Sequence, residues 1–242
     1  MPENCSFHFP LLEREKNIRA VTSRPLPAGF SPSNFAVESE FSPFLRPENI
    51  FWLRKEGFDD GRLVLAEQIH AAGVIQVKAP GLVRGVDALF TEKAGLPLAI
   101  RTADCPAVMV LFPDVPAVGI AHSGWRGSRD NIVGNLIKTM LNCWPVSPNS
   151  IKLAVSPFIR SCCYQVGEEF SGYFLPDCFI RRDDGLFLDL GKVILDQIAS
   201  LGITEERIFL SPQCTYCSEP PFYSFRRQRT ARRLLTVISI LE

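Results

Sequence analysis

The sequence lacks the features of several protein classes. Its 242 residues include only three histidines, and they contain neither a Gly-x-Gly-x-x-Gly nor a Walker-type phosphate loop. The absence of both loops argues against a doubly wound nucleotide-binding fold. Lys plus Arg and Asp plus Glu number 26 each, so no net field favours nucleic acid or an acidic membrane surface. Any anion must therefore be bound by local groups.

No stretch of the chain is typical of export or of membrane insertion. The opening residues, MPENCSFHFP, contain no basic segment followed by an apolar one. No apolar run approaches the roughly 18 residues that a bilayer span needs. We therefore expect a cytoplasmic protein without membrane contact, whose eight cysteines are reduced.

What is present predicts one globular domain over residues 1–242. The chain is 46% hydrophobic and 21% charged, and it has neither an internal repeat nor a linker. Irregularly ordered strands with a few helices indicate an α+β fold with mixed sheets. The candidate strands are 18–23, 50–53, 62–70 with 74–77 as its hairpin partner, 86–90, 107–112, 117–121, 151–155, 186–190 and 207–210. The candidate helices are 132–141, capped by Ser128 or Asp130, 168–174 and 192–201, whereas 234–241 fits a strand or a helix.

Residues 102–127 contain two of these apolar strands, and polar residues flank both. Asp104 and Cys105 precede the first strand, and His122 and Arg126 follow the second. If the strands pair antiparallel through their short turn, Cys105 and His122 meet at one sheet edge. Because buried polar groups need partners, such a cluster is typical of a functional site.

His70, Cys105 and His122 form a candidate metal set, although each of them taken singly is as well explained by packing. Three ligands leave one tetrahedral position for water or substrate, which is typical of catalytic zinc. Zinc lowers the pKa of bound water to about 7. The same ligand types bind blue copper, but Met109, the candidate axial ligand, points farther into the core.

Two features favour a bound anion. The helix expected after Gly127 would begin near His122, so its amides and Arg126 would attract negative charge there. A second cationic cluster starts at Phe222, where alternating aromatic residues predict a strand with Tyr223, Phe225 and Arg227 on one face. An arginine of this cluster can hold a phosphate through two parallel hydrogen bonds.

The pattern of the remaining cysteines does not identify a single role for them. Cys214-Thr-Tyr-Cys217 has the spacing of a redox pair or of half a zinc site. Because no second C-x-x-C completes a four-cysteine site, we expect a loop with buried thiols. For the adjacent Cys162 and Cys163 we also expect packing rather than redox work.

Six motifs together resemble one known family over residues 19–242. They are Gln-Ile-His70, Val-Asp-Ala-Leu, Thr-Ala-Asp-Cys105, His122-Ser-Gly-Trp-Arg-Gly, Ser-Cys-Cys-Tyr164-Gln-Val-Gly and Cys214-Thr followed by Phe-Tyr-Ser-Phe-Arg-Arg. This set resembles the YfiH-type family, also called the laccase-domain or multicopper polyphenol oxidase family. The resemblance implies a single domain of sandwiched mixed sheets flanked by helices, in α/β/β/α layers.

The resemblance also implies an activity similar to that of purine nucleoside phosphorylases, with adenosine, inosine or methylthioadenosine and phosphate as substrates and adenosine deamination as a side activity. It implies zinc on His70, Cys105 and His122, a site at which copper would compete. We expect a monomer or a weak homodimer. The catalytic residues implied are Asp104, Cys105, Arg126 and Tyr164. The substrate-binding residues implied are Arg24, Asn34, Gln68, Arg226 and Arg227.

The chain departs from the family pattern near the expected substrate pocket. Ser156-Pro157 replaces Gly-Pro, and Thr230-Ala231-Arg232 replaces Thr-Gly-Arg, so the choice of substrate is less certain than metal binding. Three alternatives stay open. The first is a hydrolase that edits peptidoglycan precursors, with Cys105 as nucleophile and His122 as base. The others are a copper-dependent polyphenol oxidase, for which three histidines are too few to fill several copper centres, and a binding module with structural zinc.

Overall fold

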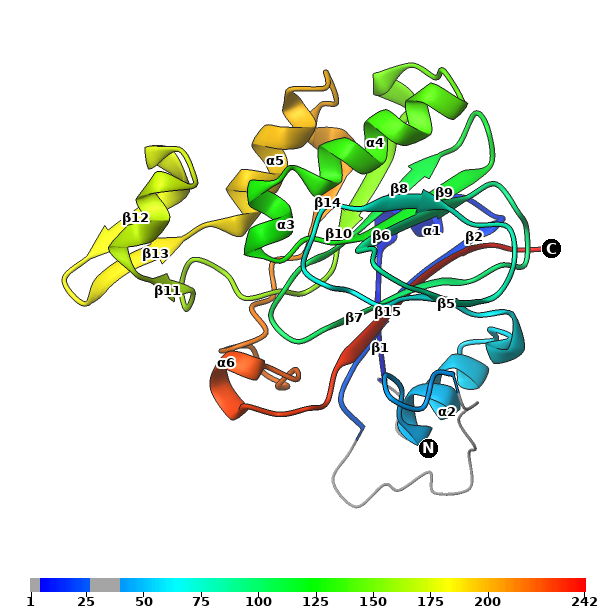
Figure 1. The fold of residues 1–242 in the computed structure, drawn as a ribbon, viewed down its shortest axis with the longest axis horizontal. Coiled ribbons are helices and arrows are strands. Elements are labelled where there is room, and N and C mark those ends of the chain that lie inside the picture. Colours follow the sequence, from blue (N-terminus) through cyan, green and yellow to red (C-terminus); the bar gives the residue numbers. More distant parts are fainter. Residues whose placement is uncertain (1–4, 27–39) are drawn as a thin grey trace.

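Two six-stranded mixed sheets pack face to face, and helices cover the outer face of each (Figure 1). The computed structural model describes residues 5–26 and 40–242. Helices α4 and α5 cover the outer face of the sheet that contains β8 and β9, and α2 covers the outer face of the sheet that contains β2 and β15 (Figure 1). The expected α/β/β/α layering with mixed sheets is confirmed.

The strands of each sheet come from distant parts of the sequence. In spatial order the first sheet contains β1 (Ser6–His8), β2 (Ile18–Ser23), β15 (Leu234–Ile240), β7 (Leu98–Thr102), β3 (Val64–Ala66) and β5 (Gly81–Val83). The second contains β14 (Ile208–Leu210), β10 (Lys152–Val155), β8 (Ala107–Phe112), β9 (Ala117–His122), β6 (Ala88–Thr91) and β4 (Val74–Gln76). The third and smallest contains β11 (Gln165–Val166), β13 (Gly185–Leu188) and β12 (Phe179–Arg182).

In the described part of the chain, six α-helices and several short 3-10 turns connect the strands. The α-helices are α1 (Pro10–Glu13), α2 (Pro47–Lys55), α3 (Trp125–Arg129), α4 (Ile132–Cys143), α5 (Leu190–Ala199) and α6 (Phe225–Gln228). The 3-10 turns are η1 (Asp60–Arg62), η2 (Pro148–Ser150), η3 (Glu168–Gly172), η4 (Pro176–Cys178) and η5 (Glu205–Arg207). Among the described residues no helix combines the length and the apolar character that crossing a bilayer requires.

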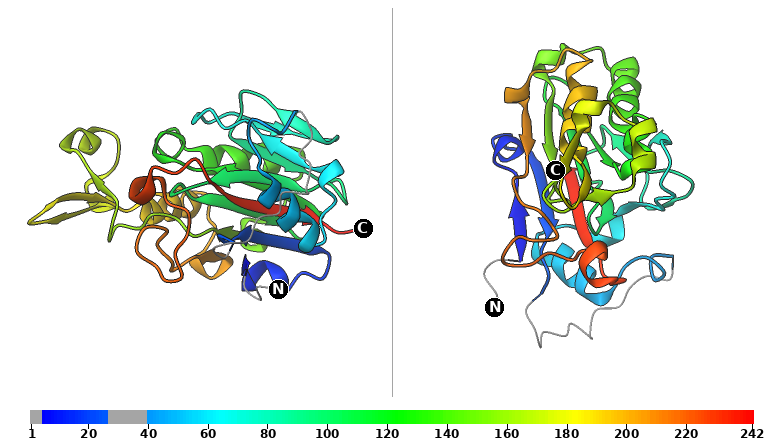
Figure 2. Two further views of the ribbon diagram at one scale, coloured as in Figure 1. Left: turned by 90° about the horizontal axis from the view of Figure 1, so that it is seen from below. Right: turned by 90° about the vertical axis from the view of Figure 1, so that its left-hand side faces the viewer.

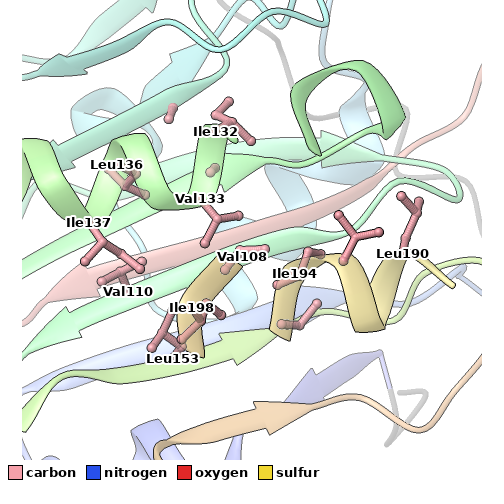
Figure 3. Close-up of a cluster of buried hydrophobic side chains, with 14 of the residues drawn as sticks. Val108, Val110, Ile132, Val133, Leu136, Ile137, Leu153, Leu190, Ile194 and Ile198 are labelled. Carbon is pink, nitrogen blue, oxygen red and sulfur yellow. The ribbon is translucent and has the colours of Figure 1, made fainter. Parts of the chain in front are cut away.

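The central strand β8 shows why both faces of its sheet are buried. Successive side chains of a strand point to opposite faces. Val108 and Val110 contribute to the core beneath α4 and α5, whereas Met109 and Leu111 contribute to the core between the two sheets. Figure 3 shows the first of these cores, with side chains of α4 and α5 packed over Val108, Val110 and Leu153. A strand buried on both faces is apolar throughout, which is why the sequence identifies it clearly.

The expected strands 18–23, 107–112, 117–121 and 151–155 are confirmed to within a residue, and 234–241 is resolved as a strand. Three other expectations are wrong. Residues 50–53 lie in α2, because Pro47 starts a helix and the Asn49 side chain accepts from the Arg46 amide. Residues 67–70 leave the strand after Ala66, and 74–77 pairs with β6 of the other sheet instead of forming a hairpin.

Two local details near the predicted site also differ from expectation. The N-cap of α4 is Asn131, in a left-handed conformation with its side chain accepting from the Gly134 amide, and neither Ser128 nor Asp130 caps it. Residues 222–227 form no strand, because the Ser224 side chain caps the short helix α6 by accepting from the Arg227 amide. The expected common face of Tyr223, Phe225 and Arg227 is therefore wrong.

The third sheet stands apart from the two large ones. Figure 2 shows β11, β12 and β13 projecting beyond the end of the sandwich, on the side where α3 and α6 lie (Figures 1 and 2). The segment that leads into β11 and the loop after β14 meet at the base of this projection, where the isolated bridge Phe158–Cys214 joins them.

Candidate metal centre

His70, Cys105 and His122 converge at one end of the sandwich. In β8 and β9 the register pairs Ala107 with His122, so Cys105, two residues before Ala107, comes close to the histidine. His70 arrives from the connection between β3 and β4, where the chain passes from one sheet to the other. One ligand atom from each of the three side chains lies within 4.8 Å of the others. The structure thus brings together the set that the sequence analysis singled out.

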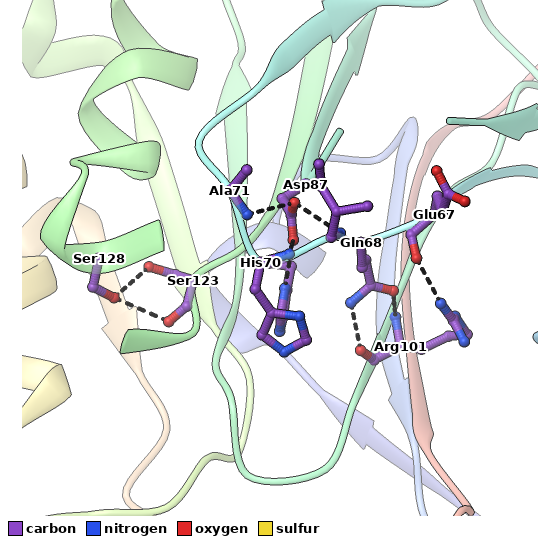
Figure 4. Close-up of polar contacts among 10 residues, drawn as sticks. Glu67, Gln68, His70, Ala71, Asp87, Arg101, Ser123 and Ser128 are labelled. Carbon is purple, nitrogen blue, oxygen red and sulfur yellow. Dashed lines mark hydrogen bonds and ion pairs between the residues drawn. The ribbon is translucent and has the colours of Figure 1, made fainter. Parts of the chain in front are cut away.

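Asp87 organises both histidines of this set. Its buried carboxylate accepts the ring Nδ1 hydrogen of His122, at 2.8 Å, and the backbone amides of Ile69, His70 and Ala71 at 2.9–3.0 Å (Figure 4). Because Nδ1 of His122 is bound to the carboxylate, Nε2 is the ring atom left for a metal. The three amide bonds hold the peptide at His70, whose φ is 61°. One side chain therefore fixes a ligand in a loop, His70, and a ligand at the end of a strand, His122.

Gln68 anchors the same loop to the first sheet. Its side-chain amide donates to the Arg101 carbonyl at 2.7 Å and accepts from the Arg101 amide at 2.9 Å (Figure 4). Both functional atoms of the side chain are thereby used by β7. Gln68 still lines the cavity at the site, but these contacts give it a role in positioning His70.

The neighbouring groups alter the ionisation of Cys105 and His122. Burial alone raises the pKa of the Cys105 thiol, but His122 and His70 outweigh burial and lower that pKa to about 6. Burial alone lowers the pKa of His122, but Cys105 and Asp87 raise it to about 9. The pair therefore favours a thiolate on Cys105, which is the form of cysteine that binds metals.

These residues fit a zinc ion. One thiolate and two imidazoles are ligands that zinc prefers, and three of them leave a position open. Gly124 keeps the space beside them clear, because a Cβ at this position would lie 3.1 Å from the Cys105 sulfur. The carboxylate of Asp87 behind His122 is the second-shell group that metal-binding histidines usually have.

A cavity of about 370 Å³ opens onto this centre. This volume is in the usual range for small-molecule sites. The residues that line it are Gln68, His70, Arg101, Thr102, Ala103, Cys105, His122, Phe225 and Arg233. A second cavity, of about 380 Å³, lies between α3, α5 and the 3-10 turn η4, and it contains none of the expected site residues.

Arg101 and Arg233 give the cavity a positive wall. Burial, together with the charge of Arg233, lowers the pKa of Arg101 to about 10, which still leaves the guanidinium charged at neutral pH. Within the described residues, Nε of Arg101 and Oγ1 of the neighbouring Thr102 are buried without a hydrogen-bond partner in the protein. Two like charges at one cavity are the pattern that an anion would complete.

The carboxylate of Asp104 lies next to the centre but is already occupied. It accepts from the Thr215 hydroxyl at 2.7 Å and from the Arg226 amide at 2.6 Å. Asp104 is buried and adopts a φ of 93°, so these bonds stabilise an unusual backbone conformation. The contacts join Asp104 to the loop that carries Phe225 into the cavity.

The other predicted residues lie at varying distances from the cavity. Burial raises the pKa of Tyr164, which therefore stays a neutral phenol, and the Arg226 guanidinium lies over its ring. Arg126 is exposed and stacks on Trp125, with its guanidinium carbon 4.3 Å from the ring centroid. The α3 helix that begins there has five residues, and the helix expected over 132–141 follows it as α4.

Arg24 and Arg227 make their contacts away from the cavity at the metal centre. Arg24 lies over the Phe222 ring and reaches Gln213 at 3.4 Å. Arg227 donates to the carbonyls of Tyr216 and Phe222. Neither lines the cavity at the metal centre. Asn34 lies outside the described residues.

Sequence reasoning missed Asp87, Arg101 and Phe225 as site residues. Asp87 stands in a motif that the family resemblance includes, but a carboxylate before an apolar strand has no local signal of its own. Arg101 is the second-last residue of the apolar strand β7, and residues near strand ends often belong to sites. Phe225 was expected on a strand, but it is the first residue of the short helix α6.

Comparisons with known proteins point to one family. The model of the family described as multi-copper polyphenol oxidoreductase laccase matches residues 32–241. The chain is 32% identical over 196 residues to a protein named purine nucleoside phosphorylase YlmD from Geobacillus stearothermophilus, covering 73% of this chain and 72% of the relative. It is 27% identical over 206 residues to purine nucleoside phosphorylase YfiH from Escherichia coli, covering 81% and 82%.

Solved structures show the same fold. The crystal structure of YlmD from Geobacillus stearothermophilus matches with a TM-score of 0.85 and 25% identity, covering 100% of this chain and 98% of that one. The crystal structure of the YfiH protein from Bacillus licheniformis matches with a TM-score of 0.81 and 23% identity, with 95% of each chain covered.

Proposed function

This chain belongs to the multi-copper polyphenol oxidoreductase laccase family, and from that membership and the site we propose that it is a zinc-dependent purine nucleoside phosphorylase. The observation that carries the proposal is the shared cavity, in which His70, Cys105 and His122 lie beside the positive wall of Arg101 and Arg233. A ligand set with an open position and an anion site in one small cavity match a reaction between a neutral nucleoside and phosphate. Relatives named purine nucleoside phosphorylase support the same choice.

The reaction exchanges one bond at the sugar. A phosphate oxygen forms a bond to the anomeric carbon, the bond from that carbon to the purine nitrogen breaks, and the base leaves with the bonding electrons and takes up a proton. When bound, zinc would supply a Lewis acid for a substrate oxygen or nitrogen. All other tasks fall to groups of the chain.

Arg101 and Arg233 would bind and orient the phosphate. Their guanidinium groups line the cavity and would provide charge-assisted hydrogen bonds. This assignment differs from the expectation that Arg126, Arg226 or Arg227 holds the phosphate. None of these three arginines lines the cavity, whereas Arg101 and Arg233 do.

Phe225 has a suitable place for the purine. It is 45% exposed and lines the cavity, so its ring offers a face on which a base can stack. Tyr164 does not line the cavity, and burial raises its pKa, so the phenol keeps its proton and is a weak acid for the leaving base. Asp104 serves as a positioning residue, since both carboxylate oxygens are engaged.

Incubation of the purified protein with adenosine, with and without phosphate, tests the proposal. We expect adenine and ribose 1-phosphate only when phosphate is present, and a smaller amount of inosine from deamination in either case. The Cys105→Ala variant should form neither product, whereas Cys143→Ser, which changes an exposed cysteine, should behave as the unaltered protein. Absence of both products from a zinc-loaded sample would reject the nucleoside reaction.

One observation favours a second candidate function. Cys105, His122 and Asp87 form a chain of thiolate, imidazole and carboxylate, which is the arrangement of a cysteine hydrolase. The peptidoglycan-precursor hydrolase would use this chain without metal. Stoichiometric zinc on Cys105 argues against it, because a metal-bound thiolate is a poor nucleophile, whereas stable acylation of Cys105 by an activated amide would support it.

A further inference from the structure

Four cysteines outside the metal centre converge where two turns meet. Cys162 and Cys163 lie in the turn before β11, and Cys214 and Cys217 lie in the turn that follows β14. Their four sulfur atoms lie within 4.8 Å of one another, and all four residues are free thiols. More than 50 residues separate the two pairs along the chain, so the fold alone brings them together.

The spacing of the sulfurs is that of ligands around one ion. The Sγ atoms of Cys162 and Cys217 are 3.7 Å apart. Four sulfurs at about 2.3 Å from a tetrahedral zinc lie about 3.8 Å from one another. A disulfide would need about 2.05 Å. The observed separation therefore matches the edge of a zinc tetrahedron and is too long for a covalent bond.

The backbone around Cys214 is arranged to support a thiolate. The Arg160 amide donates to its sulfur at 3.4 Å, and the amides of Tyr216 and Cys217 face the same atom. The Cys214 amide donates to the Ser218 hydroxyl at 2.9 Å, which closes the turn. Amide hydrogen bonds to a coordinating sulfur are a usual feature of the second shell of metal sites.

Positive groups surround the two turns. Arg182 donates to the carbonyls of Ser161 and Cys162, and Arg227 donates to that of Tyr216. A divalent ion with four thiolates carries a net charge of about −2, which nearby guanidinium groups stabilise. The same contacts hold both turns in place.

Burial does not explain the cluster. The sequence analysis expected packed thiols, but only Cys214 is buried, Cys163 is partly exposed, and Cys162 and Cys217 are exposed. It also found no second C-x-x-C, whereas the adjacent pair Cys162–Cys163 supplies the missing half in space. We propose that Cys162, Cys163, Cys214 and Cys217 bind a second, structural zinc ion with no open position.

This second ion would act on the first centre through the loop that it closes. Thr215 lies between two of its ligands, and the Thr215 hydroxyl holds Asp104, the residue next to Cys105. The second zinc would therefore join the base of the projecting β11–β13 sheet to the loop that carries Phe225. The proposal concerns metal content and does not depend on the reaction at the first centre.

Zinc analysis of protein purified with reductant and without chelator tests the proposal. We expect two zinc ions per chain in the unaltered protein and one in Cys105→Ser. The double variant Cys214→Ser/Cys217→Ser should also lose one, and the matched control Cys143→Ser should retain both. X-ray absorption of Cys105→Ser at the zinc edge should then show four sulfur neighbours at about 2.3 Å.

Two results would overturn the proposal. One is a Cys105→Ser protein without zinc whose four thiols all react at once with an alkylating reagent. The other is a disulfide between the two turns, found by mass spectrometry after thiols are trapped at cell lysis. If the double variant fails to fold, the zinc content of the unaltered protein and of Cys105→Ser still tests the proposal, because both proteins retain the four cysteines.

Discussion

His122 ends strand β9, and Cys105 and His70 lie in the connections beside it, whereas Cys162, Cys163, Cys214 and Cys217 lie in turns outside both large sheets. The first group is held by a buried carboxylate and opens onto a cavity. The second has four cysteines, of which Cys162 and Cys217 are exposed, Cys163 is partly exposed and Cys214 is buried. The first arrangement suits a reaction, and the second suits a structural clamp.

The difference concerns what holds each group in shape. Asp87 and the strand register fix the three-ligand centre without help from a metal. The turns with the four cysteines have few strand hydrogen bonds, so an ion between them would contribute much of their order. Removing metal should thus abolish activity at the first centre and loosen local structure at the second.

Asp87→Asn should have the largest effect and should damage only the first centre. The amide would direct N–H groups at donors that now face a carboxylate, so we expect a loss of about 3–5 kcal/mol in the free energy of unfolding. Zinc affinity there should fall by about 10- to 100-fold. Denaturant titration and chelator competition measure both, with the exposed Asp114→Asn as control. An unchanged affinity would mean that Asp87 does not orient His122.

Arg101→Gln tests whether the cavity of the first centre is an anion site. Losing a charge-assisted hydrogen bond costs about 1.5–3 kcal/mol, so the KM for phosphate should rise about 10- to 100-fold. The KM for the nucleoside should change much less. Steady-state kinetics with each substrate varied separate the two, and the exposed Arg14→Gln is the control. Equal changes in both constants would contradict a phosphate role.

Thr215→Val tests the link between the two regions. Loss of its hydrogen bond to the Asp104 carboxylate should lower the free energy of unfolding by about 1.5 kcal/mol. The turnover number should also fall, because the loop carrying Phe225 is less well held, while zinc content stays the same. Thr215→Ser restores the hydroxyl and should restore both values. If Thr215→Ser does not restore the stability and the turnover number, the methyl group of Thr215, and not its hydrogen bond, is responsible for both.

Gly124→Ala should have the smallest effect. The added Cβ would lie 3.1 Å from the Cys105 sulfur, so the sulfur must shift slightly. We expect a change of less than about 1 kcal/mol in unfolding and a loss in zinc affinity of less than about tenfold. Chelator competition measures the affinity. An effect on zinc at the four cysteines would contradict the separation of the two sites.

The sequence predicts those parts of the fold and site that depend on local pattern. The apolar strands β8 and β9 and their short turn are evident from the residues alone, and their pairing brings Cys105 to His122. His70 ends no strand, because the Asp87 carboxylate draws three consecutive amides out of the sheet. The expectation about its strand was wrong, although its place in the ligand set was right.

Contacts between distant segments account for what the sequence does not predict. Arg101 becomes part of an anion site only when β15 pairs with β7 and brings Arg233 to the same cavity. The two cysteine pairs meet only because β14 lies beside β10. Neither juxtaposition leaves a periodic signal in the chain, since each depends on the order of strands in a sheet.

Anomalous diffraction at the zinc edge, from crystals of protein shown to be active, tests the central claim most directly. The account predicts a strong anomalous peak between the imidazoles of His70 and His122 and the sulfur of Cys105. In the Cys105→Ala variant, this peak and the phosphate-dependent cleavage of adenosine should both be lost. Active crystals without a peak at that position would contradict the account.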